Sequence, residues 1–271
     1  MKKFGTRLIS AVLAGCMMTS VLPVSAFALE GSTEFEGNVS AQENSDAPAE
    51  PSGAEAAACP LTGGETIINN DFIKANGNVY SMSDAYTEDG AYTEGIVIDT
   101  DYDVIINVTG ETTFAKGGNK DDCANFITVR NAKSVTVNAE GQTIKTVEGL
   151  AYNRCFYAAD TFTGTAVLNG GNYNWQCDDI SACYLLGGNW TFDDLTLKTF
   201  RCAIETDKGA NVTVNGGTYD CHDSFSATFL IQNSPNSSFN GVTASGAGWV
   251  LSTNNSWVDV VGGSYSRNKA K

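Results

Sequence analysis

The chain has 271 residues, with 16 Lys and Arg against 31 Asp and Glu, a net charge of −15, and 42% hydrophobic residues. This length is enough for one or two globular domains. The shortage of basic side chains excludes a nucleic-acid interface, because binding phosphates requires clustered Lys and Arg, and it disfavours an anionic membrane surface for the same reason.

Residues 1–28 have the pattern of a secretory signal peptide. Three basic residues precede an apolar run over 8–23 and a small-residue cleavage site at 26–28. No later segment reaches the ~20 apolar residues of a membrane span, so we expect a secreted or cell-surface bacterial protein without a transmembrane segment. Residues 13–16 (Leu-Ala-Gly-Cys) also resemble a bacterial lipobox. Lipoprotein anchoring through Cys16 is therefore an alternative.

Residues 29–58 are expected to be a disordered acidic spacer. They contain seven acidic residues and no basic one, with a Pro/Ala/Ser/Gly-rich middle at 47–53. Such a segment cannot bury enough apolar surface to offset its ordering entropy, and its like charges repel one another. We interpret it as a tether, with a partner-binding tail as the alternative.

A repeat dominates the rest of the chain. Residues 168–173 (LNGGNY) recur as 214–219 (VNGGTY) and 260–265 (VVGGSY), each 46 residues after the last. Weaker copies at 192–197 and 239–244 lie halfway between them, so the period is about 23 residues. A fixed period of this length is typical of solenoid proteins.

Each repeat contains short strands. Apolar residues alternate over four to six positions before the Asn or Gly of each copy, as period-2 strands ending in a turn require. These alternating pairs are Val135/Val137, Trp190/Phe192, Val212/Val214 and Val258/Val260. A second strand is expected once per coil, at 126–130, 156–159, 183–186, 202–205, 228–232 and 249–252. No segment has helical periodicity over helical length, so the pattern predicts the coils of a parallel β-helix.

The Val-Thr-Val-Asn-Gly-Gly-Thr-Tyr units resemble the right-handed parallel β-helix of the pectate-lyase-like superfamily, which occurs in many secreted bacterial surface proteins. The resemblance covers about residues 95–271 and implies an all-β solenoid of about seven coils over 96–271. We assign residues 59–95 as the N-terminal cap and irregular first coil, since an open end invites association. No cap is recognisable before Lys271. We therefore expect an N-terminal fragment of a larger adhesin, or a last coil that pairs with something, including self-association.

Seven cysteines follow residue 28, so at least one thiol stays unpaired or pairs between molecules. Cys155, Cys183 and Cys202 are expected at equivalent positions of successive coils, as an unpaired inward ladder; disulfides between adjacent coils are the alternative. Cys177 and Cys221 lie in matching turns two coils apart, about 10 Å, and should not pair. The single His and the lack of Cys-x-x-Cys predict no metal site.

Charged residues gather in the turns after two of the repeated tyrosines, around one arginine. The set is Asp178, Asp179, Arg201, Asp220, His222 and Asp223. The superfamily resemblance implies that carboxylates around an Arg would serve a polysaccharide lyase, with calcium, or a glycoside hydrolase. Exposed salt-bridge ladders are the simpler interpretation. The Asn-Thr-Asp, Gly-His-Gly and Arg-Ile-Lys motifs of the glycosidase branch are absent, and the acidic surplus disfavours a polyanionic substrate.

Aromatic residues are the alternative binding groups. Trp175 lies in an Asn/Gln/Asp-rich turn and is expected to be exposed, so we take Trp175, Tyr173, Tyr219 and Arg201 as the binding residues. Further aromatic faces, or core residues, are Trp190, Phe200, Trp249 and Trp257. The sequence thus favours a non-catalytic binding or adhesion module for a glycan or host protein, without a cofactor. A lyase or hydrolase of the same fold is the alternative.

Overall fold

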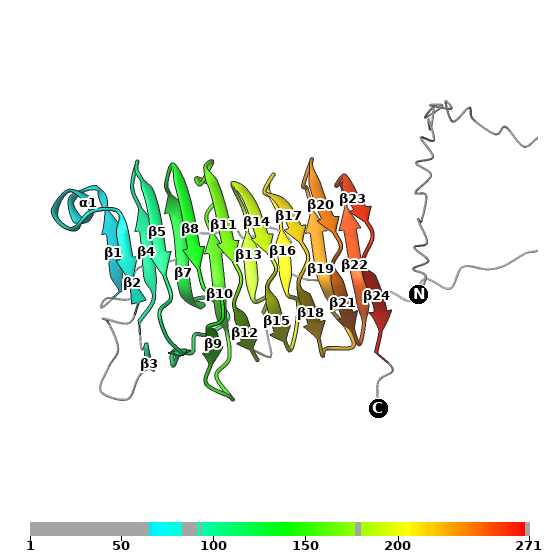
Figure 1. Cartoon of the computed structure of the whole chain (residues 1–271). Helices are drawn as coiled ribbons and strands as arrows, with labels where there is room; N and C mark the ends of the chain where they lie inside the picture. Colours follow the sequence, from blue (N-terminus) through cyan, green and yellow to red (C-terminus); the bar gives the residue numbers. More distant parts are fainter. Residues whose placement is uncertain (1–64, 83–90, 93, 177–179, 269–271) are drawn as a thin grey trace, which may run out of the picture. The chain divides into compact units, whose positions relative to one another are not determined.

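The computed structural model describes residues 65–82, 91–92, 94–176 and 180–268. They form a parallel β-helix of about seven turns with almost no helix (Figure 1). The fold class expected from the sequence is confirmed. The proposed signal peptide (1–28) and acidic spacer (29–58) lie outside the described residues.

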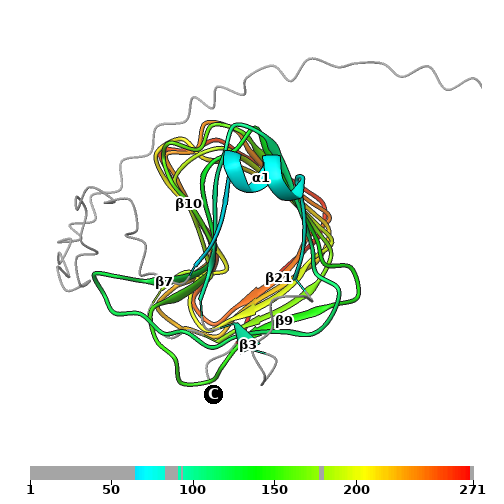
Figure 2. The ribbon, with the colours of Figure 1, turned by 90° about the vertical axis from the view of Figure 1, so that its left-hand side faces the viewer.

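Three parallel sheets of eight strands wind around one core, and each coil adds one strand to each sheet (Figure 2). The first sheet contains β1 (Thr66–Asn69), β4 (Ile96–Asp99), β7 (Ala124–Asn131), β10 (Asn153–Ala158), β13 (Cys183–Leu185), β16 (Ile204–Thr206), β19 (Ala227–Gln232) and β22 (Trp249–Asn254). The second contains β2 (Val79–Ser81), β5 (Asp103–Asn107), β8 (Ser134–Asn138), β11 (Thr165–Asn169), β14 (Asn189–Asp193), β17 (Asn211–Asn215), β20 (Ser237–Asn240) and β23 (Val258–Val261). The third contains β3 (Ala91–Tyr92), β6 (Thr112–Phe114), β9 (Thr143–Thr146), β12 (Asn172–Trp175), β15 (Thr196–Thr199), β18 (Thr218–Cys221), β21 (Thr243–Gly246) and β24 (Ser264–Arg267).

The apolar alternation of the sequence fixes which side chains face the core. In β17, Val212 and Val214 are buried while the intervening residues are partly exposed, and β14 repeats this with Trp190 and Phe192. Successive side chains of a strand point to opposite faces, so alternate residues of these strands enter the interior. The number of residues per coil varies. In the second sheet, Thr213 pairs with Thr191, which is 22 residues earlier, and with Ser238, which is 25 residues later. The spacing is longer between β5, β8 and β11, where 31 residues separate paired positions.

The single helix of the described residues, α1 (Asn70–Asn76), lies at the N-terminal end of the solenoid (Figure 2). Asn69 caps it, with its side-chain oxygen accepting a hydrogen bond from the Phe72 amide at 2.8 Å. Phe72 and Ile73 pack against the buried core. Strands β1, β2 and β3 complete the first coil before it meets β4, β5 and β6.

The Gly-Gly pairs of the repeat form the turns between the second and third sheets. Gly216 and Gly217 have φ of +65° and +79°, a region that only glycine adopts without strain. Gly217 also lies against the backbone of Leu195 in the preceding coil, where a Cβ would be 2.3 Å from the Leu195 carbonyl oxygen. Two constraints therefore require glycine at this position, one from backbone conformation and one from coil stacking.

The cysteine arrangement differs from expectation in its register. Cys123, Cys155, Cys183, Cys202 and Cys221 are free thiols, as the interpretation of an unpaired set predicts. Cys183, however, pairs with Phe156 and Ile204. Cys155 and Cys202 are thus one and two positions away from alignment, and the expected ladder of equivalent cysteines is wrong. Matching residue type across coils missed a small shift of register. Cys177 lies outside the described residues.

Candidate functional site

Four of the six charged residues singled out in the sequence come together at the corner between the third and first sheets. Arg201 follows β15. Asp220 belongs to β18 of the next coil, and His222 and Asp223 come directly after that strand. Asp178 and Asp179 lie outside the described residues. We call the described members, Arg201, Asp220, His222 and Asp223, the charged corner.

Asp220 is the most constrained member of the charged corner. His222 Nε2 lies 2.9 Å from its Oδ2, and its Oδ1 accepts hydrogen bonds from Ser245 Oγ and from Asn268 Nδ2, the latter at 3.2 Å. Partial burial raises the pKa of Asp220, but the hydrogen bonds from Ser245 and His222 outweigh this effect, so that its pKa is lower than usual. Asp220 is therefore a stable carboxylate and is unsuited to donate a proton as a general acid.

Arg201 and Asp223 are joined through a serine. Arg201 Nε donates to Ser226 Oγ at 3.3 Å, and Ser226 Oγ donates to Asp223 Oδ2 at 2.7 Å. Asp223 also accepts a hydrogen bond from the Phe225 amide at 2.9 Å, which fixes the turn. These contacts hold the arginine in place on the surface of the solenoid.

Two aromatic rings beside the charged corner are exposed. Phe225 is 87% exposed and Phe200 is 37% exposed. The sequence analysis missed Phe225. The available signal was its place in a Ser/Asp turn between β18 and β19, outside the alternation of apolar residues in the strands. An exposed aromatic side chain next to charged groups is a typical contact residue for a protein or sugar partner.

The three aromatic residues proposed for binding are buried instead. Trp175 is 0% exposed, its indole Nε1 donates to the Asn153 carbonyl at 3.1 Å, and its ring stacks on Phe114. Tyr173 and Tyr219 lie on the same inward face. The expectation of an exposed Trp175 is wrong because β12 extends through residue 175, so its side chain follows Tyr173 into the core. The repeated tyrosines do occupy equivalent positions, two coils apart.

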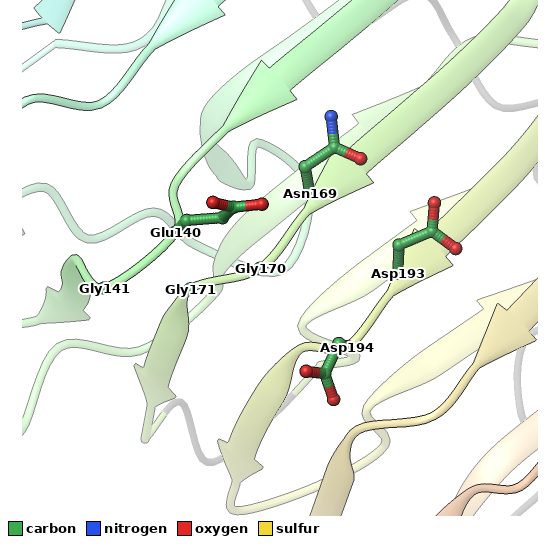
Figure 3. A pocket seen from close by; sticks show the side chains of 7 residues that line it. All are labelled: Glu140, Gly141, Asn169, Gly170, Gly171, Asp193 and Asp194. Carbon is green, nitrogen blue, oxygen red and sulfur yellow. The ribbon is translucent and has the colours of Figure 1, made fainter.

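A polar pocket of about 360 Å³ opens at another corner of the solenoid, between the second and third sheets (Figure 3). Its lining residues come from the strand ends and turns of three successive coils: Glu140, Gly141, Asn169, Gly170, Gly171, Asp193 and Asp194. Glycines leave the space open, and Asp194 adopts φ of +53° at the position that Gly170 and Gly216 occupy in neighbouring coils. Sequence reasoning assigned no role to Asp193 and Asp194 and missed the pocket.

A second pocket, of about 310 Å³, lies on the outer face of the first sheet. Asp99, Arg130, Tyr157 and Asp160 are among its lining residues. The nearby Arg154 guanidinium lies over the Tyr184 ring, 4.8 Å from its centroid. Tyr157 itself is buried, so its ring offers little surface to a ligand.

Among the described residues, no group of three or more His, Cys, Asp or Glu side chains could hold a metal ion. No helix in the same part of the chain is long and apolar enough to cross a membrane. Comparison with family models, with curated proteins and with solved structures gives no match to the chain. The structure itself therefore carries the argument about function.

Proposed function

We propose that this chain is a non-catalytic binding module of a secreted or surface-displayed bacterial β-helix protein, and that it recognises a glycan at the polar pocket. The pocket between the second and third sheets is the observation that carries this proposal. Its volume of about 360 Å³ falls at the small end of the range for ligand sites, which suits one or two sugar rings.

The chemistry of the pocket supports a neutral, hydroxyl-rich ligand. The side-chain oxygens of Asn169 and Asp193 are hydrogen-bond acceptors, as sugar hydroxyl groups require, whereas Glu140 and Asp194 add negative charge at the border of the pocket. None of the described residues that line the pocket is basic. A carboxylated or sulfated glycan would be repelled here, in a chain whose net charge is −15.

An array of neutral and acidic oligosaccharides tests the proposal with the full chain. We expect binding to neutral members only, and no release of reducing ends or of unsaturated products during incubation with the matching polysaccharides. Such products, lost on Arg201→Ala, would instead establish the lyase or hydrolase alternative at the charged corner. Binding confined to acidic glycans would contradict the proposal.

A host protein is the second candidate partner, and Phe225 favours it. An 87% exposed phenylalanine beside the charged corner is the kind of residue that anchors a protein interface. If a protein partner binds there, Phe225→Ala should weaken its binding by about 1–3 kcal/mol. The matched variant Phe200→Ala, at a less exposed ring, should have the smaller effect.

We also propose that residues 1–28 direct export of the protein and that the chain belongs to the pectate-lyase-like superfamily. The signal-peptide pattern and the parallel β-helix support them. Mass spectrometry of the exported protein tests the first part. A mature chain starting at Leu29 is expected, whereas an acylated chain starting at Cys16 would identify a lipoprotein.

A further inference from the structure

A ladder of asparagine side chains runs along the end of the second sheet. One residue at the same register position in each of six successive coils contributes to it: Asn107, Asn138, Asn169, Asp193, Asn215 and Asn240. In an ideal ladder, each side-chain amide donates a hydrogen bond to the oxygen of the preceding coil. Such ladders satisfy polar groups at the strand ends and tie neighbouring coils together.

Four of the five steps of this ladder are made. Asn138 donates to Asn107 at 2.9 Å and Asn169 donates to Asn138 at 2.8 Å. On the C-terminal side of Asp193, Asn215 donates to Asp193 at 2.7 Å and Asn240 donates to Asn215 at 2.9 Å. The missing step is the one from residue 193 to residue 169.

The chemistry of Asp193 explains the missing step. An ionised carboxylate accepts hydrogen bonds but has no proton to donate. The nitrogen of Asn169 is already directed to Asn138, so its oxygen remains on the side of Asp193 (Figure 3). Asn169 and Asp193 therefore present two acceptors to one another with no donor between them. This gap lies within the polar pocket.

We propose that the gap is the recognition point of the pocket, where two adjacent hydroxyl groups of a neutral sugar donate hydrogen bonds to Asn169 Oδ1 and to the Asp193 carboxylate. Asp193 is then the residue that determines binding. This inference rests on the proposed glycan-binding function and specifies which groups of the pocket recognise the ligand. Glu140 and Asp194 border the pocket without belonging to the ladder.

The substitution Asp193→Asn separates binding from folding. Asparagine can accept from Asn215 and donate to Asn169, so it closes the ladder and removes the acceptor pair that the sugar needs. We expect a melting temperature about 2–4 °C higher, and affinity for the sugar at least tenfold weaker, as loss of a hydrogen bond to a charged group implies. If Asp193 had a purely structural role, Asp193→Asn would not raise the melting temperature and weaken sugar binding at the same time.

Two control variants isolate the ladder. Glu140→Gln removes a charge from the pocket and leaves the ladder intact, so the affinity should change less than about threefold. Asn240→Asp opens a second gap outside the pocket, because it removes the donor to Asn215. It should lower the melting temperature without changing the affinity.

Titration of the full chain and the three variants with cellobiose, lactose and mannobiose, and separately with glucosamine and calcium chloride, decides the question. Neutral disaccharide binding that Asp193→Asn abolishes and Glu140→Gln retains supports the inference. If the parent and Asp193→Asn bind a disaccharide equally, the inference fails while the proposed function stands. If only glucosamine or calcium binds, and Glu140→Gln weakens it as much as Asp193→Asn, the pocket is a cation site. Absence of binding to every probe would refute both the inference and the glycan-binding function.

Discussion

Gly217 lies directly against Leu195 of the preceding coil. The Thr218 amide donates to the Leu195 carbonyl at 2.7 Å, and a Cβ added to Gly217 would lie 2.3 Å from that same oxygen. Gly263 has the same relationship to Val242 two coils later. The second glycine of the Gly-Gly pair is thus packed against the backbone of the preceding coil in both of these coils.

The substitution Gly217→Ala should therefore destabilise the solenoid through both strain and steric conflict. Gly241→Ala is the matched control, because Gly241 has φ of +65° but no atom within 4 Å of the added Cβ. We expect Gly241→Ala to lower the free energy of unfolding by about 1–2 kcal/mol. Gly217→Ala should cost about 1–3 kcal/mol more. Urea denaturation of both variants measures the difference, and equal losses would show that coil stacking does not constrain Gly217.

Burial of Tyr219 leads to a second prediction. Its hydroxyl oxygen is buried without a hydrogen-bond partner, and burial raises the pKa of the phenol well above its usual value. Tyr219→Phe removes an unsatisfied polar group without changing the shape of the ring, so the free energy of unfolding should increase by about 1 kcal/mol. Tyr92→Phe is the control, because the Tyr92 hydroxyl donates to the Met82 carbonyl. That variant should lose stability in the same denaturation experiment.

The lowered pKa of Asp220 predicts a pH dependence. A carboxyl group whose pKa is lower in the folded state stabilises the fold above the pKa of the unfolded chain, and this contribution disappears as the pH falls through the folded pKa. The stability difference between the parent and Asp220→Asn should therefore be present at neutral pH and shrink as the pH falls below about 4. Denaturation curves recorded across this range provide the measurement. A difference independent of pH would mean that Asp220 acts through its shape alone.

The sequence predicts the solenoid well because the repeated Gly-Gly turns mark equivalent positions in different coils. Apolar alternation at Val212 and Val214, at a fixed distance from the Gly-Gly pair, determines both the strand and its inward face. The site is harder to predict, since a pocket depends on which turn residues become neighbours across coils. The prediction that Trp175 is exposed was wrong for a related reason. The length of β12 depends on pairing with its neighbour strands, which the sequence of β12 alone does not show. A comparison of ladder positions across coils would have identified Asp193.

The final prediction concerns the last coil. Val260 of β23 is 46% exposed, whereas Phe239, its partner in β20, is fully buried. Within the described part of the chain, strands β22, β23 and β24 each have a neighbour on one side only. Strand edges without a partner open more readily than central strands, so the amides of residues 258–261 should exchange with solvent faster than those of residues 211–215 by orders of magnitude. Hydrogen exchange of the full chain, with sedimentation to establish its mass, makes the comparison. Equal protection in a monomer would contradict the prediction. Equal protection in a dimer would instead show that this end pairs with a second copy, because only new strand partners could protect those amides.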